Sequence, residues 1–244
     1  MLLHKVFLVI HILAGMLGMA LFFAPMLAKK GSPLHKKSGR WFSINMHVLA
    51  LSGMVMALLV LADPLGMKGH EKPASQSTEE YVAQISMFWD FLLLLCLLAL
   101  FNVRQGNAVL QAGLERRGLK TPLHVSLFVT TQAWAGWTLW QSLQQHFVLG
   151  QVFAIVTLVT GVGAARYLFK AQVTAAERMQ QHIGNMLGCG IAIYTAFFAL
   201  GGRRLLDLSA TAQLASWILP SVIGVVAITW YNRQWQQKLT KTPR

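Results

Sequence analysis

The sequence has few charged residues. Only 12% of its 244 residues are Asp, Glu, Lys or Arg, whereas 55% are hydrophobic. A typical soluble domain carries about 25% charged residues, and a disordered chain carries more charge and fewer apolar residues. This composition excludes both classes and is typical of a helical protein that crosses a membrane several times.

Acidic residues are especially scarce, with 8 Asp and Glu against 21 Lys and Arg and a formal net charge of +13. In a soluble protein this excess would suggest nucleic-acid binding, but base recognition needs a soluble basic module and the sequence has none. We therefore expect no nucleic-acid partner. In a membrane protein the same excess marks the cytoplasmic loops.

Cysteine is nearly absent. Cys96 and Cys189 both fall inside apolar runs, which argues against a disulfide framework. The sequence also lacks a His-x3-His or Cys-x2-Cys spacing, a phosphate-binding loop and a nucleophile elbow. The sequence therefore predicts neither a metal site nor a catalytic group.

Long apolar segments fill most of the chain. Each is long enough to cross a bilayer core of roughly 30 Å at about 1.5 Å per residue. We expect an all-α, polytopic transmembrane bundle that forms one domain. Its seven predicted helices span residues 4–28, 41–62, 81–101, 121–145, 148–168, 183–200 and 213–232.

The basic residues predict the orientation. Sixteen of the 21 Lys and Arg lie on one side of the predicted membrane, in loops 29–40, 102–120 and 166–178 and at the C-terminus, and five lie on the other. Positive charge favours the cytoplasm, so we expect the N-terminus outside and the C-terminus inside a bacterial cytoplasmic (inner) membrane. The basic segment 29–40 is also suited to contact anionic lipid.

One stretch of sequence resembles a known family. His11-x3-Gly15, Lys30-Gly31 and His35-Lys36-x-x-Gly39-Arg40-x-Phe42 are similar to the pattern of predicted bacterial multi-pass membrane proteins in the domain of unknown function 2306 family. The match covers mainly residues 11–60, and Lys36 stands where that pattern usually has Arg. The resemblance implies a membrane topology and no established activity.

Asp90 is the candidate for an interior functional group, because it lies near the middle of the apolar segment 81–101. A carboxylate at the bilayer centre costs about 2.5–3.5 kcal/mol on insertion scales, so it requires a partner. The candidates are His11, at similar depth in the first helix, Gln132 in the fourth, and Ser86 one turn back in its own helix. The site would be a proton relay, an ion site or a ligand counter-ion; the alternative is a structural Asp.

Histidines near the inner side offer a second candidate site. His47 with His124 or His182 would place two imidazoles on different helices at one depth, as the axial ligands of a b-type haem require. No spacing motif accompanies them, so the sequence leaves the cofactor unknown, with haem b as the candidate.

Three function classes stay open from the sequence. The favoured one is non-catalytic handling of a small ligand, ion or proton at an interior polar site, or an accessory role beside a membrane-protein partner. The alternatives are a redox protein that binds haem or quinone, and a membrane-embedded enzyme. Beyond the lipid bilayer, a membrane-protein partner or a second copy of the chain is a candidate partner.

Overall fold

The computed structural model describes residues 1–201 and 209–241, and within them every regular element is helical. Seven helices are long: α1 (Leu2–Leu27), α2 (Pro33–Ala62), α4 (Thr78–Gln111), α5 (Pro122–Gln144), α6 (Val148–Phe169), α7 (Ala175–Ala196) and α9 (Ala210–Lys241). Short pieces join them: α3 (Pro64–Lys68), η1 (Gly69–Glu71), η2 (Arg117–Leu119) and a π-helical turn, η3 (Phe197–Gly201). The predicted all-α class is confirmed.

Six of the helical segments are long and apolar enough to cross a membrane, by length and composition, which is a helical architecture like that of a multi-pass membrane protein. They are Leu2–Leu27, Pro33–Ala62, Thr78–Gln111, Val148–Phe169, Ala175–Gly201 and Thr211–Tyr231. Helix α5 is not among them, although it has 23 residues. Helix α5 is long enough to cross a membrane, but its most apolar stretch is more polar than those of the other six segments.

Several helices are longer than their apolar segments. Helix α2 begins at Pro33 rather than at residue 41, because the Ser32 hydroxyl accepts a hydrogen bond from the His35 amide (3.2 Å) and proline favours the first helical turn. Helix α7 begins at Ala175 rather than at 183, after a capping box of Thr174 and Glu177. Several basic residues that the sequence analysis placed in loops, such as Lys36, Lys37 and Arg178, therefore lie on the first turns of helices.

Helix α4 also extends past its predicted limits of 81 and 101. Ser77 and Glu80 form a capping box at its start. Its last turns, residues 102–111, contain several polar residues, and two of them, Gln105 and Asn107, bond to neighbouring helices. Part of the predicted loop 63–80 is helical as well, because Asp63 accepts a hydrogen bond from the Gly66 amide (2.8 Å) at the start of α3.

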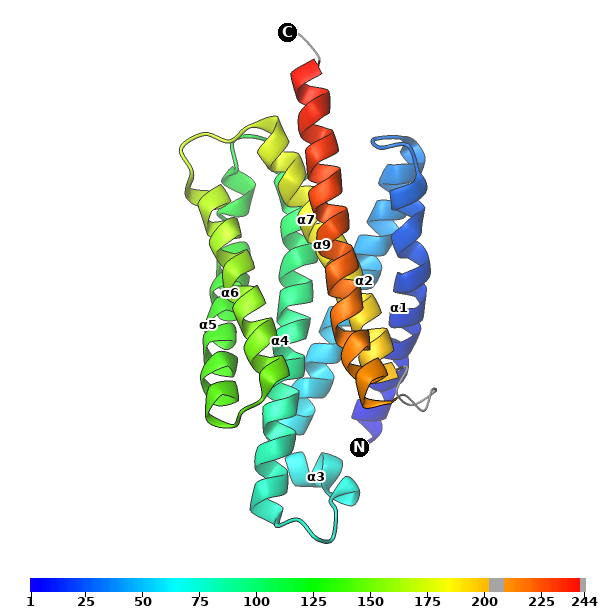
Figure 1. The fold of residues 1–244 in the computed structure, drawn as a ribbon, viewed down its shortest axis with the longest axis vertical. Helices are drawn as coiled ribbons and strands as arrows, with labels where there is room; N and C mark the ends of the chain where they lie inside the picture. The colour runs from blue at the N-terminus through cyan, green and yellow to red at the C-terminus, as the bar shows by residue number, and fades with distance from the viewer. Residues whose placement is uncertain (202–208, 242–244) are drawn as a thin grey trace.

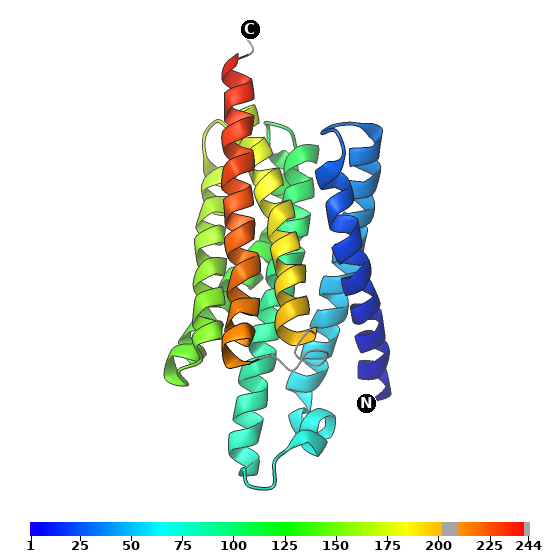
Figure 2. The same ribbon diagram turned by 45° about the vertical axis from the view of Figure 1, so that its right-hand side comes forward.

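The long helices alternate in direction, and α4 lies at the centre of the bundle (Figure 1). It packs against α2, α5 and α7, while α1 packs on α2, and α9 on α7 (Figure 2). Helices α5 and α6 form a pair on one side of α4. The main apolar core joins α2, α4 and α7 around Met46, Val103 and Cys189, all fully buried.

The loops that connect α1 to α2, α4 to α5 and α6 to α7 lie at one end of the bundle. Residues 28–32, 112–121 and 170–174 are at the end where α9 finishes, and α1 begins at the other end (Figure 1). Two basic residues counted on the opposite side, Arg203 and Arg204, lie outside the described residues. Cys96 and Cys189 are free thiols, as expected.

Candidate functional site

Asp90 finds its partner on α5. Its carboxylate accepts a hydrogen bond from the Gln141 side chain at 3.4 Å, and its main-chain carbonyl accepts one from the Trp134 indole at 3.1 Å. In the described part of the chain, no hydrogen bond joins Asp90 to His11, Gln132 or Ser86, the three partners expected from the sequence. Gln141 was not singled out by the sequence analysis.

His11 instead connects α1 to α2. Its Nδ1 lies 3.0 Å from the Leu49 carbonyl and 3.2 Å from the Ser52 hydroxyl. A side chain at the adjacent Gly53 would collide with both the Cys96 sulfur and the His11 ring, so three helices meet closely here. The expected pairing of His11 with Asp90 is therefore wrong, and His11 acts as a link between helices.

The buried face of α5 is polar. Its fully or nearly buried positions recur every three, four or seven residues, as one face of a helix requires, and four of the five are polar. Gln132 and Gln141 flank this face and are partly buried. We call His124, Thr131, Gln132, Thr138, Gln141 and Ser142 the α5 polar row.

Helix α6 supplies the opposing face of this row, and its residues there are small. Its buried positions include Gly150, Ala154, Thr157 and Gly161. A Cβ at Gly161 would overlap the Gln132 amide, and one at Gly150 would overlap the Ser142 hydroxyl. The two glycines therefore leave the space that the polar side chains of α5 fill.

Several atoms of the α5 polar row are buried without a protein partner. These are His124 Nδ1, Gln132 Nε2, Thr138 Oγ1 and Ser142 Oγ. A buried polar atom without a hydrogen bond costs about 1–3 kcal/mol, and most such atoms in proteins are satisfied by water or a ligand. Four such atoms on one helix leave hydrogen-bonding capacity that water or another small polar species can satisfy.

An apolar layer interrupts the row. Leu94 of α4, Ala135 of α5 and Ala154 of α6 are fully buried together, with Leu139 and Leu158 beside them. Ala135 lies between Thr131 and Thr138 on the buried face of α5. The row thus has one part that ends at Asp90 and another part that ends at His124, separated by this apolar layer.

The end of the row at His124 joins a network of side-chain hydrogen bonds with α4 and α7. His124 Nε2 lies 2.7 Å from Gln105 Oε1, and the Gln105 amide donates to Gln181 Oε1 of α7 at 3.5 Å. Because Gln105 offers its oxygen to the ring, Nε2 carries the hydrogen and Nδ1 is the unpartnered, basic nitrogen. His124, Gln105 and Phe101 border a narrow crevice between α4, α5 and α6.

The other two histidines of the predicted haem site bond to main-chain carbonyls. His182 Nδ1 lies 2.8 Å from the Gly106 carbonyl of α4. His47 Nδ1 lies 2.8 Å from the Ser43 carbonyl of its own helix, α2, and the Ser43 hydroxyl accepts a hydrogen bond from Asn107 of α4. His124 and His182 thus bond to consecutive residues of α4, whereas His47 bonds within α2. Groups of three or more His, Cys, Asp or Glu suited to a metal ion are not found among the described residues.

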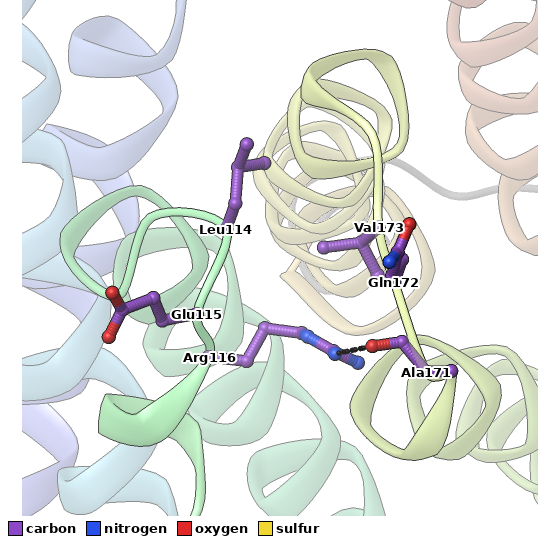
Figure 3. Close-up of a pocket in the computed structure, with 6 residues that line it drawn as sticks. All are labelled: Leu114, Glu115, Arg116, Ala171, Gln172 and Val173. Atoms are coloured by element: carbon purple, nitrogen blue, oxygen red, sulfur yellow. Dashed lines mark hydrogen bonds between the residues drawn. The ribbon is translucent and has the colours of Figure 1, made fainter.

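A larger cavity, of about 410 Å³, lies between the loops at the basic end (Figure 3). Arg116 borders it and donates to the carbonyls of Tyr167 (3.0 Å), Leu168 (3.2 Å), Ala171 (3.0 Å) and Lys170. These carbonyls are at the C-terminal end of α6, where a cation is favoured by the helix dipole. We interpret Arg116 as the cap of α6 rather than as a ligand-binding group.

The basic segment 29–40 is likewise used partly for structure. The Lys30 ammonium donates to the carbonyls of Met26 (2.7 Å) and Pro25 (3.1 Å), and it lies 5.5 Å from the centre of the Tyr231 ring. Partial burial lowers the pKa of Lys30. His35 Nδ1 also lies 2.9 Å from the Pro25 carbonyl. Lys36 and Lys37 remain exposed on the first turns of α2.

Comparison with family models, curated proteins and solved structures finds no match to this chain.

Proposed function

We propose that the chain is a protein of the bacterial cytoplasmic membrane that crosses it seven times, with the N-terminus outside and the C-terminus inside. In this proposal α5 crosses the membrane in addition to the six apolar segments. The alternating helix directions and the basic loops at one end support this topology. The bacterial membrane is part of the proposal because the sequence pattern of residues 11–60 resembles that of the domain of unknown function 2306 family. The exposed Lys36 and Lys37 are suited to contact anionic lipid.

The distribution of residues on α5 supports its role as a span. The outward positions carry large apolar side chains, including Leu123, Val129, Trp140 and Leu143, all more than half exposed. The buried positions carry the α5 polar row. A helix with an apolar outside and a polar inside is suited to a lipid environment, where ionisable and polar groups face the bundle interior.

The proposed activity is the handling of a small polar species along the α5 polar row, without covalent chemistry. The observation that carries it is the set of four buried, unpartnered polar atoms on the α5 polar row. A structural Asp alone would need one satisfied partner, and Gln141 supplies it. It would not need four unpartnered polar groups on the neighbouring helix.

The test is transport by the purified protein in lipid vesicles. Proton, thallium and urea fluxes are measured for the wild type, for Thr138→Val and for Thr130→Val. Thr138 is buried in the row, whereas Thr130 is exposed on the same helix, so the two variants remove the same hydroxyl from a buried and from an exposed position. Loss of one flux in Thr138→Val alone supports the proposal. Equal fluxes in all three proteins would contradict it.

Binding of a b-type haem is the second candidate function. His47 and His182 each engage a main-chain carbonyl through Nδ1, which leaves Nε2 as a metal ligand, an arrangement common among metal-bound histidines. A haem held there would supply electron-transfer chemistry. A Soret band in the purified protein that is lost in both His47→Ala and His182→Ala would support this candidate, and a colourless protein after haem addition would exclude it.

A further inference from the structure

We infer that the species handled by the α5 polar row is the proton, which moves between Asp90 and His124 along side chains and single water molecules. This inference rests on the proposed function and narrows it to one substrate. Three observations carry it: the size of the free space, the chemistry of the lining groups and the place of the two titratable residues.

The free space at the inner end is small. The crevice beside His124 has a free volume of about 10 Å³ and is bordered by Phe101, Phe128 and Ala164. A cavity needs about 10–15 Å³ of this kind to hold one water molecule. The crevice beside His124 is therefore at the lower limit for one water molecule and is too small for an organic solute.

The lining groups are suited to protons and not to metal ions. Hydroxyl, amide and neutral imidazole groups each donate and accept hydrogen bonds, as a relay of protons through hydrogen-bonded water requires. A bound calcium ion needs six to eight oxygen ligands, and other hard cations also need several. Among the described residues, the only carboxylate within hydrogen-bond distance of the α5 polar row is that of Asp90.

The titratable residues lie near the two ends of the row. Asp90 bonds to Gln141 near the outer end of α5, and His124 lies at the first turn of the helix. At about 1.5 Å per residue, Gln141 and His124 are about 25 Å apart along the axis. Between them the row offers hydroxyl and amide groups, so water must complete the hydrogen-bonded path.

Each transfer conserves atoms and charge. The Asp90 carboxylate binds a proton from the outer water and becomes a neutral carboxylic acid. The O–H bond of this acid then breaks, and a neighbouring water molecule in the row takes the proton. His124 Nδ1, the unpartnered nitrogen, accepts a proton at the inner end. The imidazolium then returns to the neutral form by giving a proton to inner water. One proton crosses the row, and no oxidation or reduction occurs.

The apolar layer of Leu94, Ala135 and Ala154 is the barrier on this path. Apolar constrictions exclude water and so restrict conduction. A hydroxyl added at Ala135 would stand between Thr131 and Thr138 and give water a partner inside the layer. The barrier is therefore testable by a gain in flux as well as by a loss.

The experiment measures proton flux in vesicles that contain a pH-sensitive dye, with a potassium gradient and valinomycin to set the membrane potential. We expect Ala135→Ser to raise the protein-dependent flux several-fold. We expect Asp90→Asn to lower it by about 100-fold, as for loss of a positioned proton-transfer group. Thr130→Val, on the exposed face, keeps the wild-type flux. Elution as a single species and helical circular dichroism establish that each variant is folded.

Thallium and urea are measured in parallel. If the flux of thallium or urea falls in Thr138→Val while the proton flux does not fall, the proton inference is wrong and the proposed function stands. If no probe crosses in a protein-dependent manner, both are wrong. Proton flux that is unchanged in folded Asp90→Asn and in Ala135→Ser also overturns the inference.

Discussion

The Asp90 carboxylate of α4 accepts its hydrogen bond from Gln141 of α5, 3.4 Å away. The contact joins the central helix to the helix with the most polar interior face. Both residues are partly buried, and removal of one partner leaves the other without its protein hydrogen bond, which costs more than the net value of the bond.

We therefore predict that Gln141→Leu destabilises the protein by about 1–3 kcal/mol, because Asp90 then lacks its protein partner. The measurement is thermal unfolding in detergent. Gln144→Leu is the matched control, since Gln144 is exposed one turn away on α5. Equal melting temperatures for the two variants would show that the Asp90 contact contributes nothing.

Glycines on α6 provide a second prediction. Gly161→Ala places a methyl group where the Gln132 amide lies, so the side chain or the helix must move. We expect a loss of about 1–3 kcal/mol, as for overpacking of a core. Gly163→Ala is the control, because a Cβ there meets no atom within 4 Å. A loss of stability in Gly163→Ala as large as in Gly161→Ala would contradict this packing argument.

Much of the bundle could be predicted from the sequence, because apolar length determines which segments cross a membrane. The helix ends could not. Residues 102–111 and 175–182 are polar, and they are helical because of capping boxes and bonds to other helices, which hydropathy does not report. The basic residues after Pro33 are helical for a similar local reason.

The candidate site was predictable only in part. Depth along a helix placed Asp90 in the interior, but depth does not specify which neighbouring side chain faces it, and so the predicted partners His11, Gln132 and Ser86 did not include Gln141. The α5 polar row left a signal that the sequence analysis missed. His124, Thr131, Thr138 and Ser142 recur at helical spacing within one apolar segment, which is the pattern of a polar interior face.

Arg116 supports a prediction about the basic end. Arg116→Lys should not restore the cap, because a lysine ammonium is one compact donor group and cannot reproduce the planar guanidinium that reaches four carbonyls. We expect both Arg116→Lys and Arg116→Ala to speed hydrogen exchange at residues 167–171. Lys120→Ala, at an exposed position in the same loop, should leave exchange unchanged. Protection at residues 167–171 in Arg116→Ala equal to the wild type would exclude the capping role.

The last prediction concerns orientation, on which the direction of the proposed path depends. Cysteines introduced at Ser75, between η1 and α4, and at Lys120, before α5, lie at opposite ends of the bundle, and both positions are exposed in the structure. The native thiols do not compete, because Cys189 is fully buried and burial among helices leaves Cys96 little access. A membrane-impermeant maleimide added to intact cells should label Ser75→Cys and should label Lys120→Cys only after the membrane is opened. The reverse pattern would invert the proposed topology and exchange the roles of Asp90 and His124, because the carboxylate would then face the cytoplasm. Labelling of both positions in intact cells would require an even number of crossings between them, which is incompatible with α4 as a single span.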